Sequence, residues 1–232
     1  MNLTGLTIII FTLFMSPSVW AQSSLQLKVE HYPPLLDMNS PKQGLVYELA
    51  EQAFATQRIE TEIIYTSKED ILRSVDDLRC ATFSYERDKD NSKDWYYSRA
   101  IVLRPYIYLK HIDSDIELHD RSDLRKYSLK FTQKEPLYDI TSMEELLDHK
   151  LDLFSVPLYS AVHYLKNNFT KSDAKNLEFL FSPSIRSENI YLACHKSHPS
   201  CFNLIRKFNK GLETIEQNGH RQRIVKKYLS WQ

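Results

Sequence analysis

The chain has 232 residues, and its 30 lysines and arginines are balanced by 30 aspartates and glutamates. This balance leaves no basic excess, which argues against a nucleic-acid partner. Aromatic residues make up 12% of the chain and include 14 tyrosines, which is enough for a hydrophobic core and for the lining of a binding cleft.

The N-terminus has the pattern of a signal peptide. A mostly apolar run from Leu6 to Met15 leads to Val19 and Ala21, which occupy the −3 and −1 positions of a cleavage site. The run is shorter than the ~20 apolar residues that span a bilayer. We therefore expect residues 1–21 to be removed and the mature protein, which starts at Gln22, to be periplasmic. The alternative is a buried N-terminal helix.

Strand-like and helix-like segments alternate along the rest of the chain. Apolar residues at alternating positions or in short runs predict strands at 25–29, 59–65, 79–84, 101–109, 127–132, 151–155, 177–181 and 189–194. Helical spacing and start signals predict helices at 45–54, after Ser67, from Thr141, from Pro157, at 199–217 and at 221–229. This alternation predicts an α/β fold of mainly parallel sheets with helices on both faces.

Three local signals mark helix ends. Ser67 with Asp70 has the pattern of a helix cap, and Thr141 with Glu144 has the pattern of a capping box. Gly219 separates the last two helices.

No low-complexity linker is present, so two lobes in this chain must be joined by strands or short crossovers, which is hinge geometry. A ligand of such a sheet lies at the carboxyl ends of the strands.

The chain contains three cysteines, Cys80, Cys194 and Cys201. Cys194 and Cys201 flank a short turn-like stretch, and export to an oxidising compartment favours a disulfide between them. The alternative is a metal site that uses His195 or His198. Cys80 is left without a partner and is expected to be buried.

Five motifs follow one another along the chain, namely Tyr32-Pro33-Pro34-Leu35, Gly44-x-x-x-Glu48-Leu49, Thr82-x-Ser84-x-Glu86-Arg87, Trp95-Tyr96-Tyr97-Ser98 and the C-terminal stretch 208–228. In this order and spacing the chain resembles the periplasmic solute-binding proteins of family 3, best known from polar amino-acid uptake. The resemblance implies a periplasmic-binding-protein-like α/β fold of type II, with two lobes. It places lobe 1 at residues 22–100 and 191–232 and lobe 2 at 101–190, with hinge crossings near 99–104 and 188–192.

The resemblance also implies a function. A small polar, carboxylate-bearing molecule would be captured between the lobes by a monomer without a cofactor, and an inner-membrane permease or sensor would be the partner. Arg87 would hold the ligand carboxylate, because a guanidinium donates two parallel hydrogen bonds to it. Thr82 and Ser84 would add hydroxyl groups, and Tyr32 and Trp95 would wall the cleft. The plainer alternatives are a surface arginine in a charged run and two ordinary core rings.

Two features of the amino-acid binders are missing. Their lobe 2 has a glycine-containing loop after its first strand, whereas residues 132–136 contain no glycine. They also often place an aspartate at the helix start after a lobe 2 strand, to hold the ligand ammonium, whereas this chain has Val156 and Pro157 there. The sequence therefore does not preserve the α-amino-acid pocket.

An enzyme is the competing class. Some relatives of the fold are dehydratases that use a cleft carboxylate as general acid, and Glu30 and Glu188 are candidates by position. Neither is paired with a second catalytic group in the sequence, and no metal signature or phosphate loop stands out. We therefore expect a binding protein and not an enzyme. A free periplasmic sensor of the same fold is the alternative.

Overall fold

The computed structural model describes residues 24–73, 80–84, 93–132, 140–183 and 186–230. The expected signal peptide and Arg87 lie outside these residues. None of the described helices is long and apolar enough to cross a membrane.

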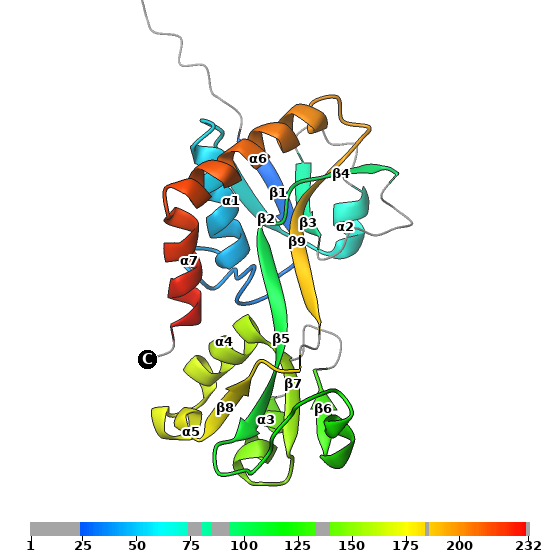
Figure 1. Cartoon of the computed structure of the whole chain (residues 1–232). Coiled ribbons are helices and arrows are strands. Elements are labelled where there is room, and N and C mark those ends of the chain that lie inside the picture. Colours follow the sequence, from blue (N-terminus) through cyan, green and yellow to red (C-terminus); the bar gives the residue numbers. More distant parts are fainter. Residues whose placement is uncertain (1–23, 74–79, 85–92, 133–139, 184–185, 231–232) are drawn as a thin grey trace, which may run out of the picture.

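Two lobes are joined by two long strands, β5 (Val102–His111) and β9 (Ser187–His195) (Figure 1). Lobe 1 contains β1 (Leu25–Val29), α1 (Leu45–Ala55), β2 (Thr61–Tyr65), α2 (Lys68–Arg73), β3 (Cys80–Ser84), β4 (Trp95–Tyr97), α6 (Cys201–Gln217) and α7 (His220–Leu229). Lobe 2 contains a 3-10 helix (Asp123–Lys126), β6 (Leu129–Phe131), α3 (Ile140–Leu147), β7 (Leu153–Pro157), α4 (Leu158–Asn168), α5 (Lys171–Lys175) and β8 (Leu177–Leu180).

One sheet runs through both lobes. Its described strands follow the order β2-β1-β3-β9-β5-β7-β6, while β4 also pairs with β9 and β8 with β5. β1 is parallel to β2 and β3, and β6 is parallel to β7. β5 and β9 are antiparallel to every strand with which they pair. The predicted parallel pairing therefore occurs inside each lobe, and antiparallel strands form the joint.

The joint is a short ladder in which Val102 to Pro105 pair with Ser187 to Ile190. Beyond it, β5 leaves β9 and continues into lobe 2 between β7 and β8. In the other direction β9 continues into lobe 1, where it pairs with β3 and β4. The expected crossings near 99–104 and 188–192 coincide with this ladder. The lobe boundaries at residues 100 and 190 stay a prediction.

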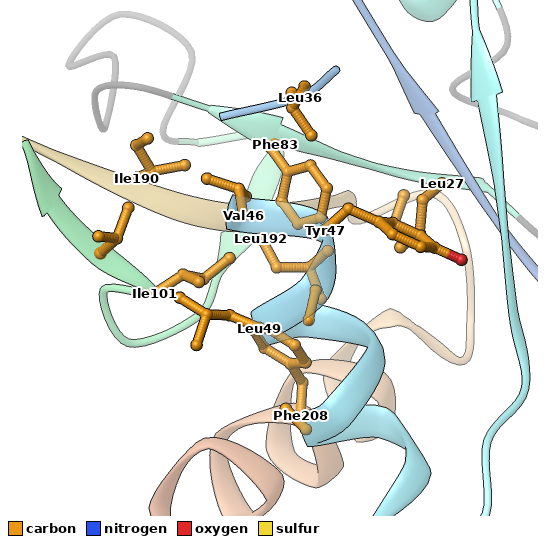
Figure 2. Close-up of a cluster of buried hydrophobic side chains, with 14 of the residues drawn as sticks. Leu27, Leu36, Val46, Tyr47, Leu49, Phe83, Ile101, Ile190, Leu192 and Phe208 are labelled. Atoms are coloured by element: carbon orange, nitrogen blue, oxygen red, sulfur yellow. The ribbon is translucent and has the colours of Figure 1, made fainter. Parts of the chain in front are cut away.

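Each lobe has its own hydrophobic core. In lobe 1, Leu49 of α1 and Phe208 of α6 pack against Phe83 and Leu192 of the sheet (Figure 2). In lobe 2, apolar clusters cover both faces of the sheet. One side chain of lobe 2, Tyr159 of α4, belongs to the core of lobe 1 instead. Because most core contacts stay inside one lobe, a change in the angle between the lobes breaks few of them.

The predicted helix ends are partly right. The Ser67 hydroxyl accepts the backbone N–H of Asp70 at 3.2 Å, as the cap predicted, and Gly219 separates α6 from α7 with a φ of 75°. The capping box at Thr141 is wrong, because Ile140 is already helical and Thr141 therefore lies inside α3. Pro157 is the N-cap of α4 and not part of its first turn.

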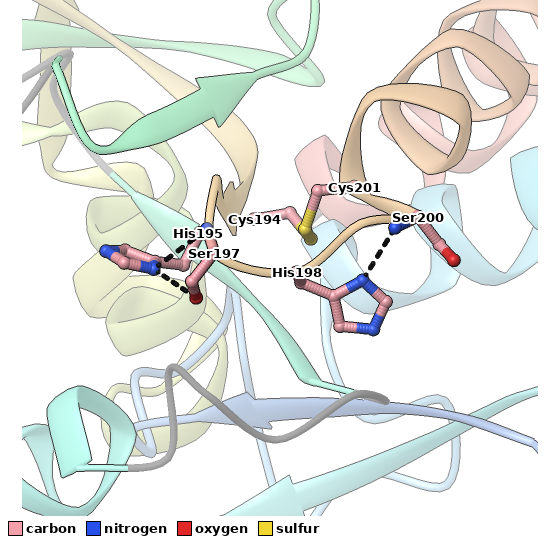
Figure 3. Close-up of a disulfide and its surroundings, with 6 residues drawn as sticks. All are labelled: Cys194, His195, Ser197, His198, Ser200 and Cys201. Carbon is pink, nitrogen blue, oxygen red and sulfur yellow. Dashed lines mark hydrogen bonds between the residues drawn. A yellow bond between two sulfur atoms is a disulfide. The ribbon is translucent and has the colours of Figure 1, made fainter.

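Cys194, near the end of β9, and Cys201, at the start of α6, form a disulfide with their Cα atoms 5.6 Å apart (Figure 3). The predicted pairing is confirmed, and the alternative of thiolate metal ligands is wrong because the two sulfurs bond each other. The neighbouring histidines have local partners. The ring of His195 lies 2.7 Å from the Ser197 hydroxyl, and the ring of His198 accepts the backbone N–H of Ser200 at 3.0 Å.

This bridge predicts a thiol count. Denatured but unreduced protein should contain a single reactive thiol, from Cys80, and reduced protein should contain all three. The Cys201→Ser variant is the control, since it should free Cys194 as well. Closing a loop of this length stabilises the folded state by about 2–3 kcal/mol. Three reactive thiols in the unreduced protein would contradict the bridge.

Candidate functional site

Three of the predicted ligand residues lie on one side of the lobe 1 sheet. Thr82 and Ser84 of β3 and Trp95 of β4 are paired with alternate residues of β9. Alternate residues of a strand face the same side, and directly paired residues share a side, so these three side chains face away from the core. Phe83, between the first two, packs into the core. Arg87 follows this strand outside the described residues.

The two aromatic residues predicted to wall the cleft, Tyr32 and Trp95, lie in different places. Tyr32, in the loop after β1, is only 5% exposed and belongs to the lobe 1 core, while its hydroxyl accepts a hydrogen bond from Arg104. Trp95 is half-buried, and its ring meets that of His195 edge to face at 5.1 Å. The structure therefore groups Trp95 with Thr82 and Ser84, and it connects Tyr32 to the joint between the lobes.

The polar residues at this joint are a group that the sequence did not reveal. They are Tyr32, Arg104, Tyr106, Arg186 and Glu188, here called the hinge cluster. Arg104 of β5 lies opposite Glu188 of β9 and forms a salt bridge with it, with side chains 4% and 13% exposed. Arg104 also donates to the Tyr32 hydroxyl and, at 3.2 Å, to the Tyr106 hydroxyl. A buried guanidinium needs such partners, because removing a charge from water is costly.

Arg186 covers the cluster on its solvent side. Its guanidinium carbon lies 4.0 Å from the centre of the Tyr106 ring, and it donates to the Tyr106 hydroxyl at 2.5 Å. The same hydroxyl donates to Glu188 Oε1 at 3.2 Å, whereas Oε2 accepts from Arg104. Both carboxylate oxygens of Glu188 are thus occupied by donors from the protein. This arrangement holds the loop after β1 against both crossing strands, and it does not offer Glu188 to a substrate as a general acid.

The loop that carries Tyr32 is fixed by Gly44. This glycine has a φ of 95°, and a Cβ there would lie 2.5 Å from the carbonyl oxygen of Leu35. The close approach lets the first two N–H groups of α1 donate to loop carbonyl oxygens at 2.9 Å. The glycine of the second sequence motif therefore serves loop geometry, and the start of α1 is already satisfied by its own loop.

Glu48 of the same motif anchors the C-terminal helix. Its carboxylate accepts two hydrogen bonds from Lys227, at 2.8 and 2.6 Å, and one from the Tyr228 hydroxyl at 2.9 Å. Burial and the neighbouring Glu48 carboxylate raise the pKa of Tyr228, so its phenol stays protonated and donates. The motif thus joins α7 to α1 and does not reach the joint.

On lobe 2, the ends of β6, β7 and β8 point toward the joint. β6 is parallel to β7, and both β7 and β8 are antiparallel to β5, so all three run in one direction. Thr132, just after β6, donates its backbone N–H and its hydroxyl to the carbonyl oxygen of Ser155, at 2.9 and 3.0 Å. α4 follows β7 directly, with Pro157 as its N-cap and no acidic residue in its first turn.

No family model matches the sequence, and no curated protein matches it. Solved structures do match. The second substrate-binding domain of a putative amino acid ABC transporter from Streptococcus pneumoniae is 17% identical with a TM-score of 0.70, over 90% of this chain and 100% of that chain. The L-cystine solute receptor of Neisseria gonorrhoeae, in its unliganded open conformation, is 12% identical with a TM-score of 0.71. The alignment covers 90% of this chain and 94% of that receptor.

A histidine kinase sensor domain is also similar. It is 14% identical to this chain with a TM-score of 0.61, and the alignment covers 89% of this chain and 96% of that domain. That sensor domain is itself similar to periplasmic binding proteins. All three similarities extend over both lobes and the ladder between them. The chain therefore has the two-lobed α/β fold of the periplasmic binding proteins.

Proposed function

We propose that this protein captures a small polar solute with a carboxylate group between its lobes, for transport. The observation that supports this most is the antiparallel ladder of β5 and β9, which joins two separately packed lobes. Such a joint lets the lobes close on a ligand, provided that the closed form holds the ligand better than the open form does. The solved structures of similar fold include receptors for amino acids, which supports a ligand of this kind.

The rest of the proposal concerns location and partners. Cleavage after Ala21 would release the mature protein into the periplasm, where an inner-membrane permease would take up the solute. The chain would act as a binding protein and not as an enzyme, in keeping with the occupied oxygens of Glu188. The similar histidine kinase sensor domain supports one alternative, in which the loaded protein docks on a membrane sensor instead of a permease.

The experiment is titration calorimetry with Arg87 variants. Wild type is first titrated with a panel of amino acids and carboxylates. We expect Arg87→Ala to weaken binding about ten- to a hundredfold, since the loss of a hydrogen bond to a charged group costs about 1.5–3 kcal/mol. Arg87→Lys keeps the charge but loses the planar fork, so it should also weaken binding.

Arg206→Ala is the matched control, because Arg206 is an exposed arginine on α6. It should leave affinity unchanged. Equal affinity of wild type and Arg87→Ala would show that Arg87 does not hold the ligand. A wild-type protein that binds nothing in a broad panel of small solutes would contradict the proposed function itself.

A further inference from the structure

A side chain of lobe 2 is buried in lobe 1. Tyr159, the second residue of α4, is 5% exposed and belongs to the hydrophobic cluster of lobe 1. The other buried members of that cluster come from residues 27–102 and 190–215. The next tyrosine of the same helix, Tyr164, packs against the core of lobe 2 instead. The Tyr159 ring therefore crosses from one lobe to the other.

The helix that carries Tyr159 also faces lobe 1 beyond this ring. α4 contacts α7, the C-terminal helix of lobe 1, and Figure 1 shows the two helices next to each other. His163 lies one helical turn after Tyr159 and therefore on the same face of α4. Burial lowers the pKa of the His163 imidazole, and the Asp37 carboxylate, in the loop after β1, acts in the opposite direction. Two positions of α4 thus face lobe 1.

The lobe 1 side of this contact is itself held in place. Arg221, at the start of α7, donates to the carbonyl oxygen of Ile101 at 3.2 Å and to Glu216 of α6 at 2.9 Å. Burial raises the pKa of the Tyr159 phenol, and the positive charge of Arg221 partly offsets this rise. The Tyr159 ring is thus buried near a guanidinium that is bonded to the residue directly before β5.

Tyr159 is also connected to the ladder between the lobes. Pro157, two residues before it, pairs with Tyr106 of β5, and Tyr106 directly follows the last ladder residue, Pro105. A rotation of lobe 2 about the ladder therefore carries the ring with it and moves it relative to the lobe 1 core. Because protein interiors are closely packed, the ring cannot follow a large rotation and stay buried.

We infer that Tyr159 anchors the lobes to each other and holds the ligand-free protein at one lobe angle until the ring leaves the lobe 1 core. Burial of an aromatic side chain shifts an equilibrium about ten- to a hundredfold. A solute that requires another lobe angle must supply this factor from its own contacts. Tyr159 thereby lowers the affinity for such a solute without touching it.

The test measures the distance between the lobes in ligand-free protein. Spin labels are attached at Asn203→Cys on α6 and Glu144→Cys on α3, both at exposed positions, in a Cys80→Ser background. Double electron–electron resonance then gives the distribution of the interlobe distance. We expect one narrow distribution in this labelled parent. Adding Tyr159→Ala should lower the share of molecules at the main distance by about half, as the loss of a tenfold preference requires.

Tyr164→Ala is the matched control, because it removes the same kind of side chain from the same helix but from the core of lobe 2. It should leave the distribution narrow. Tyr159→Phe should do the same, since it keeps the ring. Circular dichroism checks that each variant folds. If Tyr159→Ala does not fold, Tyr159→Leu takes its place and should also widen the distribution, because it removes the ring and keeps an apolar side chain.

Equal distributions for the labelled parent and Tyr159→Ala would overturn the inference, and so would a broad distribution in the parent or in Tyr159→Phe. The protein is free of ligand throughout, so these outcomes do not depend on which solute is captured. A failure of the anchor leaves the proposed function standing. A failure of solute binding in the Arg87 experiment leaves the anchor standing.

Discussion

We expect Glu188→Leu to lower the free energy of unfolding by about 3–5 kcal/mol, because it leaves a buried charge without its counter-ion. Arg104 is only 3% exposed, so water cannot take the place of the lost carboxylate without rearrangement of the joint. The tyrosine hydroxyls that remain around it are neutral and do not replace the carboxylate. Urea unfolding monitored by circular dichroism measures the change.

A second variant tests whether the lost stability comes from the unpaired charge or from the changed packing. The double variant Arg104→Met with Glu188→Leu removes both charges and keeps apolar volume, so it should recover most of the lost stability. Arg186→Ala is the exposed control. Its side chain is 59% exposed, so its loss should cost less than about 1 kcal/mol. Equal stability of Glu188→Leu and Arg186→Ala would show that the hinge cluster is not held by the buried pair.

Gly211→Val should destabilise lobe 1 by about 3 kcal/mol or more, because no space exists for its side chain. Gly211 lies on α6 where this helix packs against α1. A Cβ at this position would lie 2.7 Å from the carbonyl carbon of Ala53 and closer still to its oxygen. The helices would have to separate, and Phe54 and Phe208, whose rings are 4.7 Å apart, would lose contact. Thermal unfolding measures the loss.

Gly219→Ala is the matched glycine variant. A Cβ there meets only Arg223 Nη1 at 3.5 Å, but the backbone has a φ of 75°. The cost is therefore that of a left-handed conformation, about 1–2 kcal/mol, without any steric overlap. If Gly211→Val lowered the melting temperature no more than Gly219→Ala does, α1 and α6 would not be in close contact.

The element order was predictable because apolar periodicity reflects burial directly. β1 matches its expected range, and most other strands differ from theirs by a few residues. The direction of the crossing strands was not predictable. An antiparallel and a parallel strand show the same alternation of side chains, so the pattern of Val102 to Leu109 says nothing about its partners.

The hinge cluster was missed for a similar reason. Arg104 is the one charged residue of the stretch from Ile101 to Leu109, and Glu188 lies 84 residues further along the chain. A charge inside an apolar strand must find a partner when the strand is buried, and that signal was present in the sequence. What the sequence lacks is the register that pairs the two, which depends on how the lobes are joined. The roles of Thr82 and Ser84 rest on resemblance and stay predictions.

The path of the chain through the ladder divides lobe 1 into two parts that are far apart in sequence, from which we expect a particular order of folding. The chain builds β1, α1, β2 and β3 of lobe 1 by residue 84, but β9 and α6, which complete its sheet and core, come only after residue 186. All elements of lobe 2 are made in between, and their strands pair within residues 106–180, whereas β9 of lobe 1 pairs back to residues 82–84. Contacts between near neighbours form faster than those that close long loops. A chain released in mid-synthesis thus carries one finished half and an unfinished apolar surface, which is the form that a chaperone would recognise.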